Sequence, residues 1–432
     1  MTAAHQGPEG RENSVVKIKP FRGWRPRREL ADKIPSLPYD VMDSDEARAM
    51  AEGDPHTFLH VVKPEIDLDP SISVYDDQVY DRGRANLKGL MDRGDLVRDE
   101  APAFYLYRVS IEGHSQLGLV AAAAVDDYRD GKIKRHEFTR PEKENDRTRH
   151  IETMQAHPGP VFLTYRPVPE LTALLNALSR EDAGVDFTAA DGVRHELWPV
   201  SDTETCTKIE NMFARIPATY VADGHHRAAA ASRAGASLRE RLEDPSGNEP
   251  CNYFLAVHFP SDQMRILDYN RIVKDLNGLT ADDLLDKIKA AGYSIREDWK
   301  PRRAEHPETF GMYVGGRWHC LVPGGPVIDG REGTARLDVS ILTETVLQPI
   351  LGIGDPRSDK RIEFVGGIRG MDELERRVDS GDWGVAFSLY PTSMDSVMQV
   401  ADAGEVMPPK STWFEPKLRS GMVVLSLEGE TL

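Results

Sequence analysis

The spacing of apolar and polar residues predicts a chain in which short strands alternate with helices. Apolar residues recur at helical spacing in some segments and form short apolar or alternating runs in others. Helices are predicted at residues 44–53, 73–93, 170–180, 203–215, 281–291, 338–351, 371–379 and 393–401. Strands are predicted at residues 57–62, 103–110, 117–125, 161–165, 251–259, 265–267, 310–314, 317–322, 362–365 and 384–389. This order indicates an α+β or mixed α/β fold.

The stretch Val221–Arg227 reads Val-Ala-Asp-Gly-His-His-Arg and lies between an apolar, strand-prone run and an alanine-rich, helix-prone run. We therefore expect a strand, a tight turn at Asp223-Gly224, and a helix that begins near His225. The first turn of a helix has unpaired backbone N–H groups and the positive end of the helix dipole. With two imidazoles and a guanidinium added, the turn favours an anion, above all a phosphate. The alternative is a solvated surface turn in which Asp223 is an ordinary N-cap.

Residues 132–150 form a second unusual stretch, with seven Lys or Arg, four acidic residues and two His. Apolar periodicity is nearly absent and Pro141 interrupts the segment, so we expect a solvated loop rather than a packed element. The same residue types suit phosphoryl transfer. Arg and Lys neutralise phosphate oxygens, and a carboxylate can bind Mg²⁺ or accept a proton from an attacking hydroxyl.

Composition narrows the classes of function. The 432 residues carry a formal net charge of −17, which argues against broad electrostatic binding to nucleic acid or to an anionic membrane. The sequence has no apolar run of about 18 residues. The cysteines Cys206, Cys251 and Cys320 are far apart, which predicts a reducing, cytoplasmic location. We expect a disordered lead-in at residues 1–14 and regions with soft borders at 15–150, 151–330 and 331–432.

Residues Gly404–Ser411 nearly match the Walker A pattern. Pro409 stands where the second glycine belongs, and a proline has no N–H to donate to a phosphate. A predicted helix, rather than a strand, precedes the segment. These features exclude a P-loop, although Lys410 and Ser411 remain candidates to line a substrate site.

Several motifs together resemble the DUF1015 family, from about Lys17 to Leu427. They are Phe21-Arg22-Gly23, Pro38-Tyr39-Asp40-Val41, Phe58-Leu59-His60-Val61, Lys134-Arg135-His136-Glu137, Thr139-Arg140-Pro141, Asp146-Arg147-Thr148-Arg149-His150, Ala222-Asp223-Gly224-His225-His226-Arg227 and Met407-Pro408-Pro409-Lys410-Ser411-Thr412. The Asp-Gly-His-His-Arg element is similar to the phosphate-binding turn of the ParB/sulfiredoxin superfamily, which includes CTP-hydrolysing ParB, ATP-using sulfiredoxin and kinases that phosphorylate free serine. The resemblance implies a ParB/sulfiredoxin-like nucleotide-binding core with additional α+β elements. The element lacks the cysteine of sulfiredoxin, and the chain shows no DNA-binding helix-turn-helix, so the resemblance favours a small-molecule kinase.

The resemblance also implies roles for individual residues. The nucleotide, ATP or ADP with CTP as a further option, is bound by Asp223, Gly224, His225, His226, Arg227, Arg135, His136, Arg140, Arg147, Arg149 and His150. Catalysis is assigned to Glu137, His226 and Arg227. Glu137 is the expected base or Mg²⁺ ligand, and Asp40 is a second candidate. The acceptor, an amino acid such as free serine, is expected to contact Asp40, Lys410 and Ser411.

Two other functions fit the same residues. One is a metal-dependent hydrolase, with ligands from Asp223, His225, His226, His136 and His150. Adjacent histidines at a helix start point about 100° apart, which is a poor chelating geometry. The other is a ParB-like nucleotide-binding sensor that acts on a partner and transfers nothing to an amino acid. The oligomeric state is left open by the sequence.

Overall fold

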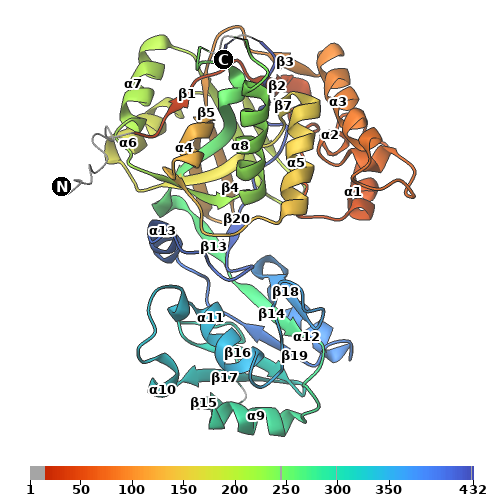
Figure 1. The fold of residues 1–432 in the computed structure, drawn as a ribbon, viewed down its shortest axis with the longest axis vertical. Helices are drawn as coiled ribbons and strands as arrows, with labels where there is room; N and C mark the ends of the chain where they lie inside the picture. Colours follow the sequence, from red (N-terminus) through yellow and green to blue (C-terminus); the bar gives the residue numbers. More distant parts are fainter. Residues whose placement is uncertain (1–14, 244–245, 298, 430) are drawn as a thin grey trace, which may run out of the picture. The chain divides into compact units, whose positions relative to one another are not determined.

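The computed structural model describes residues 15–243, 246–297, 299–429 and 431–432, and the chain divides into two compact units (Figure 1). Unit 1 comprises Met1–Gln263 and Pro416–Leu432, and unit 2 comprises Met264–Glu415. These units do not follow the expected borders near residues 150 and 330, because strands from both sides of residue 150 share one sheet. The lead-in predicted for residues 1–14 lies outside the described residues.

The described residues of unit 1 are organised on a nine-stranded mixed sheet. Its order is β6 (Ile133–Lys134), β11 (Thr219–Asp223), β8 (Val161–Tyr165), β12 (Tyr253–Pro260), β5 (His114–Ala124), β4 (Phe104–Ile111), β10 (Arg194–Val200) and β9 (Val185–Thr188), and β1 (Ile18–Lys19) pairs with β5. β11 runs parallel to β6, and β12 runs parallel to β8. The central strands are buried along nearly their whole length, as expected where both faces of a sheet are covered.

Helices pack on one face of this sheet in two groups. The first group, α6 (Pro169–Leu178) and α7 (Thr203–Phe213), packs on residues of β4, β5 and β10, and the second, α4 (Val125–Arg129), α5 (Pro141–Met154) and α8 (His225–Arg239), packs on residues of β8, β11 and β12. A smaller cluster in unit 1 joins α1 (Ser44–Ala51), α2 (Leu59–Val62), α3 (Asp77–Asp92) and β3 (Leu96–Arg98). Two short pairs complete unit 1, β2 (Trp24–Pro26) with β3 and β7 (Ala156–His157) with β21 (Leu425–Ser426).

The described part of unit 2 contains a six-stranded antiparallel sheet. Its order is β15 (Tyr293–Arg296), β17 (Arg317–Pro323), β16 (Phe310–Val314), β19 (Val385–Ser388), β14 (Tyr269–Val273) and β18 (Ile362–Gly366). The helices of this unit are α9 (Ala281–Ala290), α10 (Gly325–Ile328), α11 (Asp338–Leu342), α12 (Gly370–Asp379) and α13 (Met394–Asp402). β13 (Arg265–Leu267) pairs with β20 (Trp413–Glu415).

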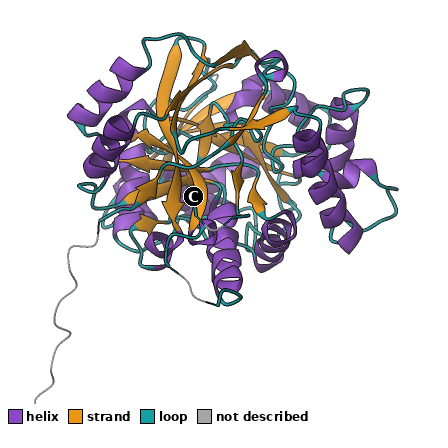
Figure 2. Cartoon of the chain, turned by 90° about the horizontal axis from the view of Figure 1, so that it is seen from above, coloured by secondary structure: helices purple, strands orange, loops and turns teal. Residues whose placement is uncertain are grey.

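The mixed α and β fold predicted from the sequence is confirmed (Figure 2). The strand predicted at residues 57–62 is wrong. Residues 59–62 form α2, because a short apolar run fits a buried helical turn as well as a strand. The single helix predicted at 338–351 is also wrong, since α11 passes into a π-helical turn at Thr343–Leu347. Across the described residues, every helix is too short or too polar to span a membrane.

The expected loop at residues 132–150 is wrong as well, because α5 begins at Pro141. A proline suits the first position of a helix, where its missing N–H is not needed and its fixed φ angle is already helical. The helix buries Ile151 and Met154 together with the polar residues Asp146 and His150. Its apolar face is short, which explains why periodicity did not reveal it.

Candidate functional site

The turn between β11 and α8 has the strand, turn and helix that the sequence predicts. Gly224 is the N-cap of α8 and adopts φ 88°, a left-handed conformation that favours glycine. A register shift between Val221 and Asp223 in β11 precedes it. No side chain caps the first turn of α8, so Asp223 is not its N-cap. The first turn of a helix offers backbone N–H groups to an anion.

Asp223 is held by two donors. Nζ of Lys417 donates to Oδ2 at 2.9 Å, and the N–H of Gly224 donates to Oδ1 at 2.7 Å. Burial opposes ionisation of Asp223, but Lys417 and the Gly224 N–H outweigh it and hold the pKa of Asp223 below its usual range. The pair is therefore ionic. Lys417 was missed by the sequence reasoning, because it lies almost 200 residues from Asp223 in the sequence and outside every motif.

Arg227 is partly buried one position after the two histidines. Its Nη2 lies 3.4 Å from the hydroxyl of Ser420, and its guanidinium lies 5.2 Å from the centre of the Tyr39 ring. In the described part of the chain, no carboxylate lies within ion-pair distance of this guanidinium. Burial lowers the pKa of Arg227, although an arginine keeps its charge in any ordinary protein site. The site thus holds a cation without a bonded counter-ion.

A small cavity opens beside this turn. We call it the α8 pocket. It is lined by Pro38, Asp40, Pro160, Phe162, Asp223, Gly224, Arg227, Lys417, Leu418 and Ser420, all from unit 1. A hypothetical Cβ on the nearby Gly159 would lie 1.9 Å from Nη1 of Arg227, so only glycine leaves room for the guanidinium at this position.

The second unusual stretch lies against the start of α8. The N–H of Arg140 donates to Nε2 of His226 at 3.0 Å, and the rings of His136 and His225 meet edge to face at 4.5 Å. The Arg147 guanidinium lies 4.2 Å from the centre of the same Tyr39 ring that Arg227 contacts. Figure 1 shows α5 and α8 side by side, and many residues of the two helices are in contact. Parts of the segment 134–150 therefore lie against the turn that contains Arg227.

Burial lowers the pKa of His136 to about 3 and the pKa of His225 to about 4. Both rings are therefore neutral near pH 7. Nε2 of His225 is buried and has no hydrogen-bond partner among the described residues. We conclude that these histidines can offer hydrogen bonds to a ligand but no positive charge.

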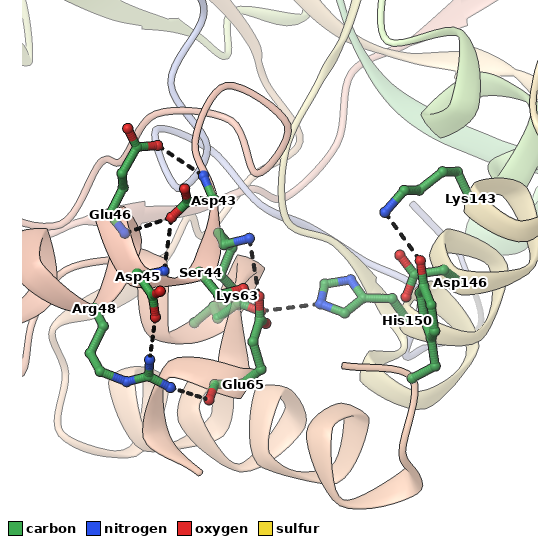
Figure 3. A network of polar contacts seen from close by, with 12 residues as sticks. Asp43, Ser44, Asp45, Glu46, Arg48, Lys63, Glu65, Lys143, Asp146 and His150 are labelled. Carbon is green, nitrogen blue, oxygen red and sulfur yellow. Dashed lines mark hydrogen bonds and ion pairs between the residues drawn. The ribbon is translucent and has the colours of Figure 1, made fainter. Parts of the chain in front are cut away.

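Other expected site residues make contacts elsewhere in unit 1. Arg135 lies over the ring of Tyr128, and Arg149 lies over the ring of Tyr80 and pairs with Asp77. Nε2 of His150 donates to the carbonyl of Val61 at 3.1 Å, which fixes α5 to α2 (Figure 3). The side chain of Arg140 is exposed, and that of Glu137 is half-buried beside His136.

Lys410 and Ser411 belong to unit 2. The carbonyl of Lys410 accepts a hydrogen bond from Nη2 of Arg271 at 3.0 Å, and the hydroxyl of Ser411 donates to the carbonyl of Pro408 at 2.6 Å. Lys410 has φ 59°, in the left-handed region. These contacts give the Pro-Pro-Lys-Ser segment a structural role within its own unit.

The ligands considered for a metal-dependent hydrolase can be compared with the geometry. In the described ranges, no group of three or more His, Cys, Asp or Glu side chains is arranged to hold a metal ion. Of the five ligands considered, Nε2 of His226 accepts from Arg140 and Nε2 of His150 donates to Val61. Those two ring nitrogens form hydrogen bonds within the protein.

The family model described as "Protein of unknown function (DUF1015)" matches residues 18–340. The chain belongs to the DUF1015 family. The resemblance expected from the motifs is thereby confirmed. No curated protein matches this DUF1015 chain.

Solved structures show weak similarity to this member of the family. Free serine kinase in complex with AMP is 15% identical, over 71% of this chain and 92% of that chain, with a TM-score of 0.34. A conserved hypothetical protein from Pyrococcus furiosus is 15% identical, over 69% and 90%, with a TM-score of 0.34. SbnI with a C-terminal truncation, from Staphylococcus aureus, is 12% identical, over 70% and 85%, with a TM-score of 0.38. Similarity at this level does not identify an activity.

Proposed function

We propose that the protein is a nucleotide-dependent phosphotransferase whose acceptor is the hydroxyl of a small amino acid, with free serine as the first candidate. The observation that carries the proposal is Arg227, a partly buried cation without a carboxylate partner among the described residues. It lies in the first turn of a helix whose N-cap, Gly224, has no capping side chain. An anion at this point gains charge-assisted hydrogen bonds, backbone donors and the helix dipole together.

A nucleotide's phosphates fit the donors of the α8 pocket. Gly224 lets the backbone approach closely, and Arg227 and Arg147 lie around the Tyr39 ring. Asp146 pairs with Arg147, at 2.9 Å from its Nε, and so fixes that guanidinium in place. In this proposal ATP or ADP binds through its phosphates at α8, and CTP is a further option. His225, whose ring is neutral, and His226 then orient terminal oxygens by hydrogen bonds.

Phosphoryl transfer also calls for Mg²⁺, which prefers a few carboxylate oxygens together with water and phosphate. Asp40 lines the α8 pocket, and Glu137 lies in the segment that packs against the start of α8. In this proposal these two carboxylates would hold such an ion. When bound, the ion would neutralise charge on the phosphate oxygens. The same two carboxylates are the candidates to accept the proton of the acceptor hydroxyl, Glu137 first.

The deciding experiment incubates the purified full-length chain with ATP, ADP or CTP, Mg²⁺ and each free amino acid, and follows products by phosphorus NMR. The proposal expects a phosphomonoester with one amino acid and one nucleotide. Nucleotide binding without transfer to any amino acid would favour the ParB-like sensor. Tightly held, stoichiometric zinc or manganese would favour the hydrolase.

Exchange of the proposed base sharpens this test. Glu137→Gln removes a proton acceptor and keeps the shape, so turnover should fall about 100-fold while nucleotide affinity changes less than about threefold. Glu142→Gln is the matched control, because Glu142 is an exposed carboxylate in the same segment. If Asp40→Asn lowers turnover and Glu137→Gln does not, the role of base passes to Asp40.

A further inference from the structure

The last segment of the chain contributes to the α8 pocket although it lies far from every motif of the proposed site. The chain leaves unit 2 after Glu415 and rejoins unit 1 at Pro416. Lys417 and Ser420 then line the pocket together with Arg227. The matched family region ends at residue 340, so this segment lies beyond it.

Arg419 anchors this segment to the strands of the unit 1 sheet. Its side chain is almost fully buried, its Nε donates to Nε2 of His195 at 3.2 Å, and its backbone N–H donates to the hydroxyl of Tyr107 at 3.3 Å. Its guanidinium also pairs with Asp191. Burial and the Arg419 charge lower the pKa of His195 to about 3. The ring therefore stays neutral and keeps the lone pair that Arg419 needs.

The backbone adds a second attachment next to this one. Ser420 and Ser36 exchange two backbone hydrogen bonds, at 2.9 and 3.0 Å, and the N–H of Gly421 donates to the carbonyl of Pro158 at 3.0 Å. Lys417 lies two residues before Arg419. The segment that sets its position is therefore bonded both to the sheet, through Arg419, and to neighbouring loops, through Ser420 and Gly421. A side chain held this way loses little conformational entropy when a ligand arrives.

Asp223 forms an ion pair with Lys417. The Lys417 side chain is 14% exposed. The carboxylate of Asp223, which lines the pocket together with Arg227, holds the Lys417 ammonium at 2.9 Å. The pocket therefore presents a second fixed cation, which approaches from the C-terminal segment and not from α8.

We propose that Lys417 is a phosphate-binding residue of the α8 pocket and that Arg419 is the positioning residue that holds it there. This inference rests on the proposed function for the identity of the anion, a phosphate chain. The ammonium contacts one set of phosphate oxygens, while Arg227 and the first turn of α8 contact another. Asp223 orients the lysine through the ion pair.

The test uses the full-length chain and measures the affinities of inorganic triphosphate and ATP by calorimetry, with melting temperatures as a check on folding. Lys417→Met should weaken both affinities at least tenfold. Lys19→Met is the matched control, because Lys19 forms an ion pair of the same length with Glu210, at 2.9 Å, elsewhere in unit 1. That variant should bind as the wild type does.

Two further variants keep the inference testable. Should Lys417→Met fail to fold, Lys417→Arg preserves the charge and the pairing with Asp223 but shifts the donors, so triphosphate affinity should still change at least threefold. Arg419→Gln should weaken triphosphate binding. In the Arg419→Gln background, Lys417→Met should cause a smaller further loss of triphosphate affinity than it causes alone, because the lysine is no longer held in place. Full additivity of the two changes would remove the positioning role of Arg419.

The outcomes separate this inference from the proposed function. Unchanged triphosphate and ATP affinities in Lys417→Met overturn the inference, even if phosphoryl transfer is observed. Lys417-dependent triphosphate binding without transfer to any amino acid supports the inference and removes the proposed function. A wild-type chain that binds neither triphosphate nor ATP overturns both.

Discussion

Arg227 in unit 1 and Arg271 in unit 2 each lie over an aromatic ring but have different hydrogen-bond partners. For both, no carboxylate lies within ion-pair distance in the described part of the chain, and each guanidinium lies over an aromatic ring, Tyr39 for Arg227 and Phe364 for Arg271. Burial lowers the pKa of both, to about 10 for Arg271. Arg271, however, donates to the carbonyls of its own unit, whereas Arg227 has one long contact to a hydroxyl.

This difference separates a structural arginine from a binding one. The donors of Arg271 are used by backbone oxygens, including that of Lys410, so the residue fixes the Pro-Pro-Lys-Ser turn. Most donors of Arg227 have no such acceptor, and no nitrogen of Arg227 is among the described buried atoms that lack a hydrogen-bond partner. These donors are therefore accessible to a ligand anion. The lack of a carboxylate alone therefore does not mark a site, and the count of used donors does.

The largest effect is expected from Arg227→Ala. Loss of charged hydrogen bonds worth about 2–3 kcal/mol should weaken ATP binding about 30- to 150-fold, as measured by calorimetry. The free energy of unfolding should change little, because the protein itself uses few of the donors. Arg233→Ala is the control, since Arg233 lies on the same helix and bonds to Glu144 and Asn145. Equal affinity loss in both variants would contradict a specific role for Arg227.

Arg271→Ala should show the opposite pattern. Loss of the guanidinium leaves carbonyl oxygens of Tyr269 and Lys410 without a donor, so the free energy of unfolding should fall by about 2 kcal/mol in urea denaturation. Relief of the buried charge offsets part of that cost. ATP affinity should stay within about twofold of the wild type. A loss of affinity comparable to that of Arg227→Ala would break the distinction between the two arginines.

Local sequence patterns predicted much of the fold. The β11–α8 turn follows from a glycine between a strand-prone run and an alanine-rich run, and the β16–β17 hairpin follows from Gly315-Gly316. The errors arose where propensity had no tertiary context. Residues 59–62 fit either state, and α5 hides its helical character because it buries Asp146, Thr148 and His150 as well as apolar residues.

The site was only partly accessible from sequence, for a related reason. The sequence could not show which charged residues of α5 face α8 and which face α3. Arg147 lies with Arg227 around Tyr39. Arg149, two positions later on α5, instead contacts Tyr80 and Asp77 of α3. Lys417 and Ser420 reach the pocket through the return of the chain from unit 2, a long-range contact that no local pattern encodes.

Gly159→Ala gives the smallest and sharpest test of the comparison. The backbone of Gly159 lies outside the left-handed region, so an alanine can adopt it, but the new methyl would meet Nη1 of Arg227 and the hydroxyl of Ser420. The flexible guanidinium should move aside at little cost in stability, and the affinity for ATP should fall about tenfold, or about 1.4 kcal/mol. Gly184→Ala is the control, because its methyl meets only ordinary contacts at 3.5 Å. An unchanged ATP affinity in Gly159→Ala, with melting temperatures equal to the wild type, would mean that the exact placement of Arg227 does not matter to the ligand, and that its sparse bonding reflects a loosely held surface cation rather than a prepared binding group.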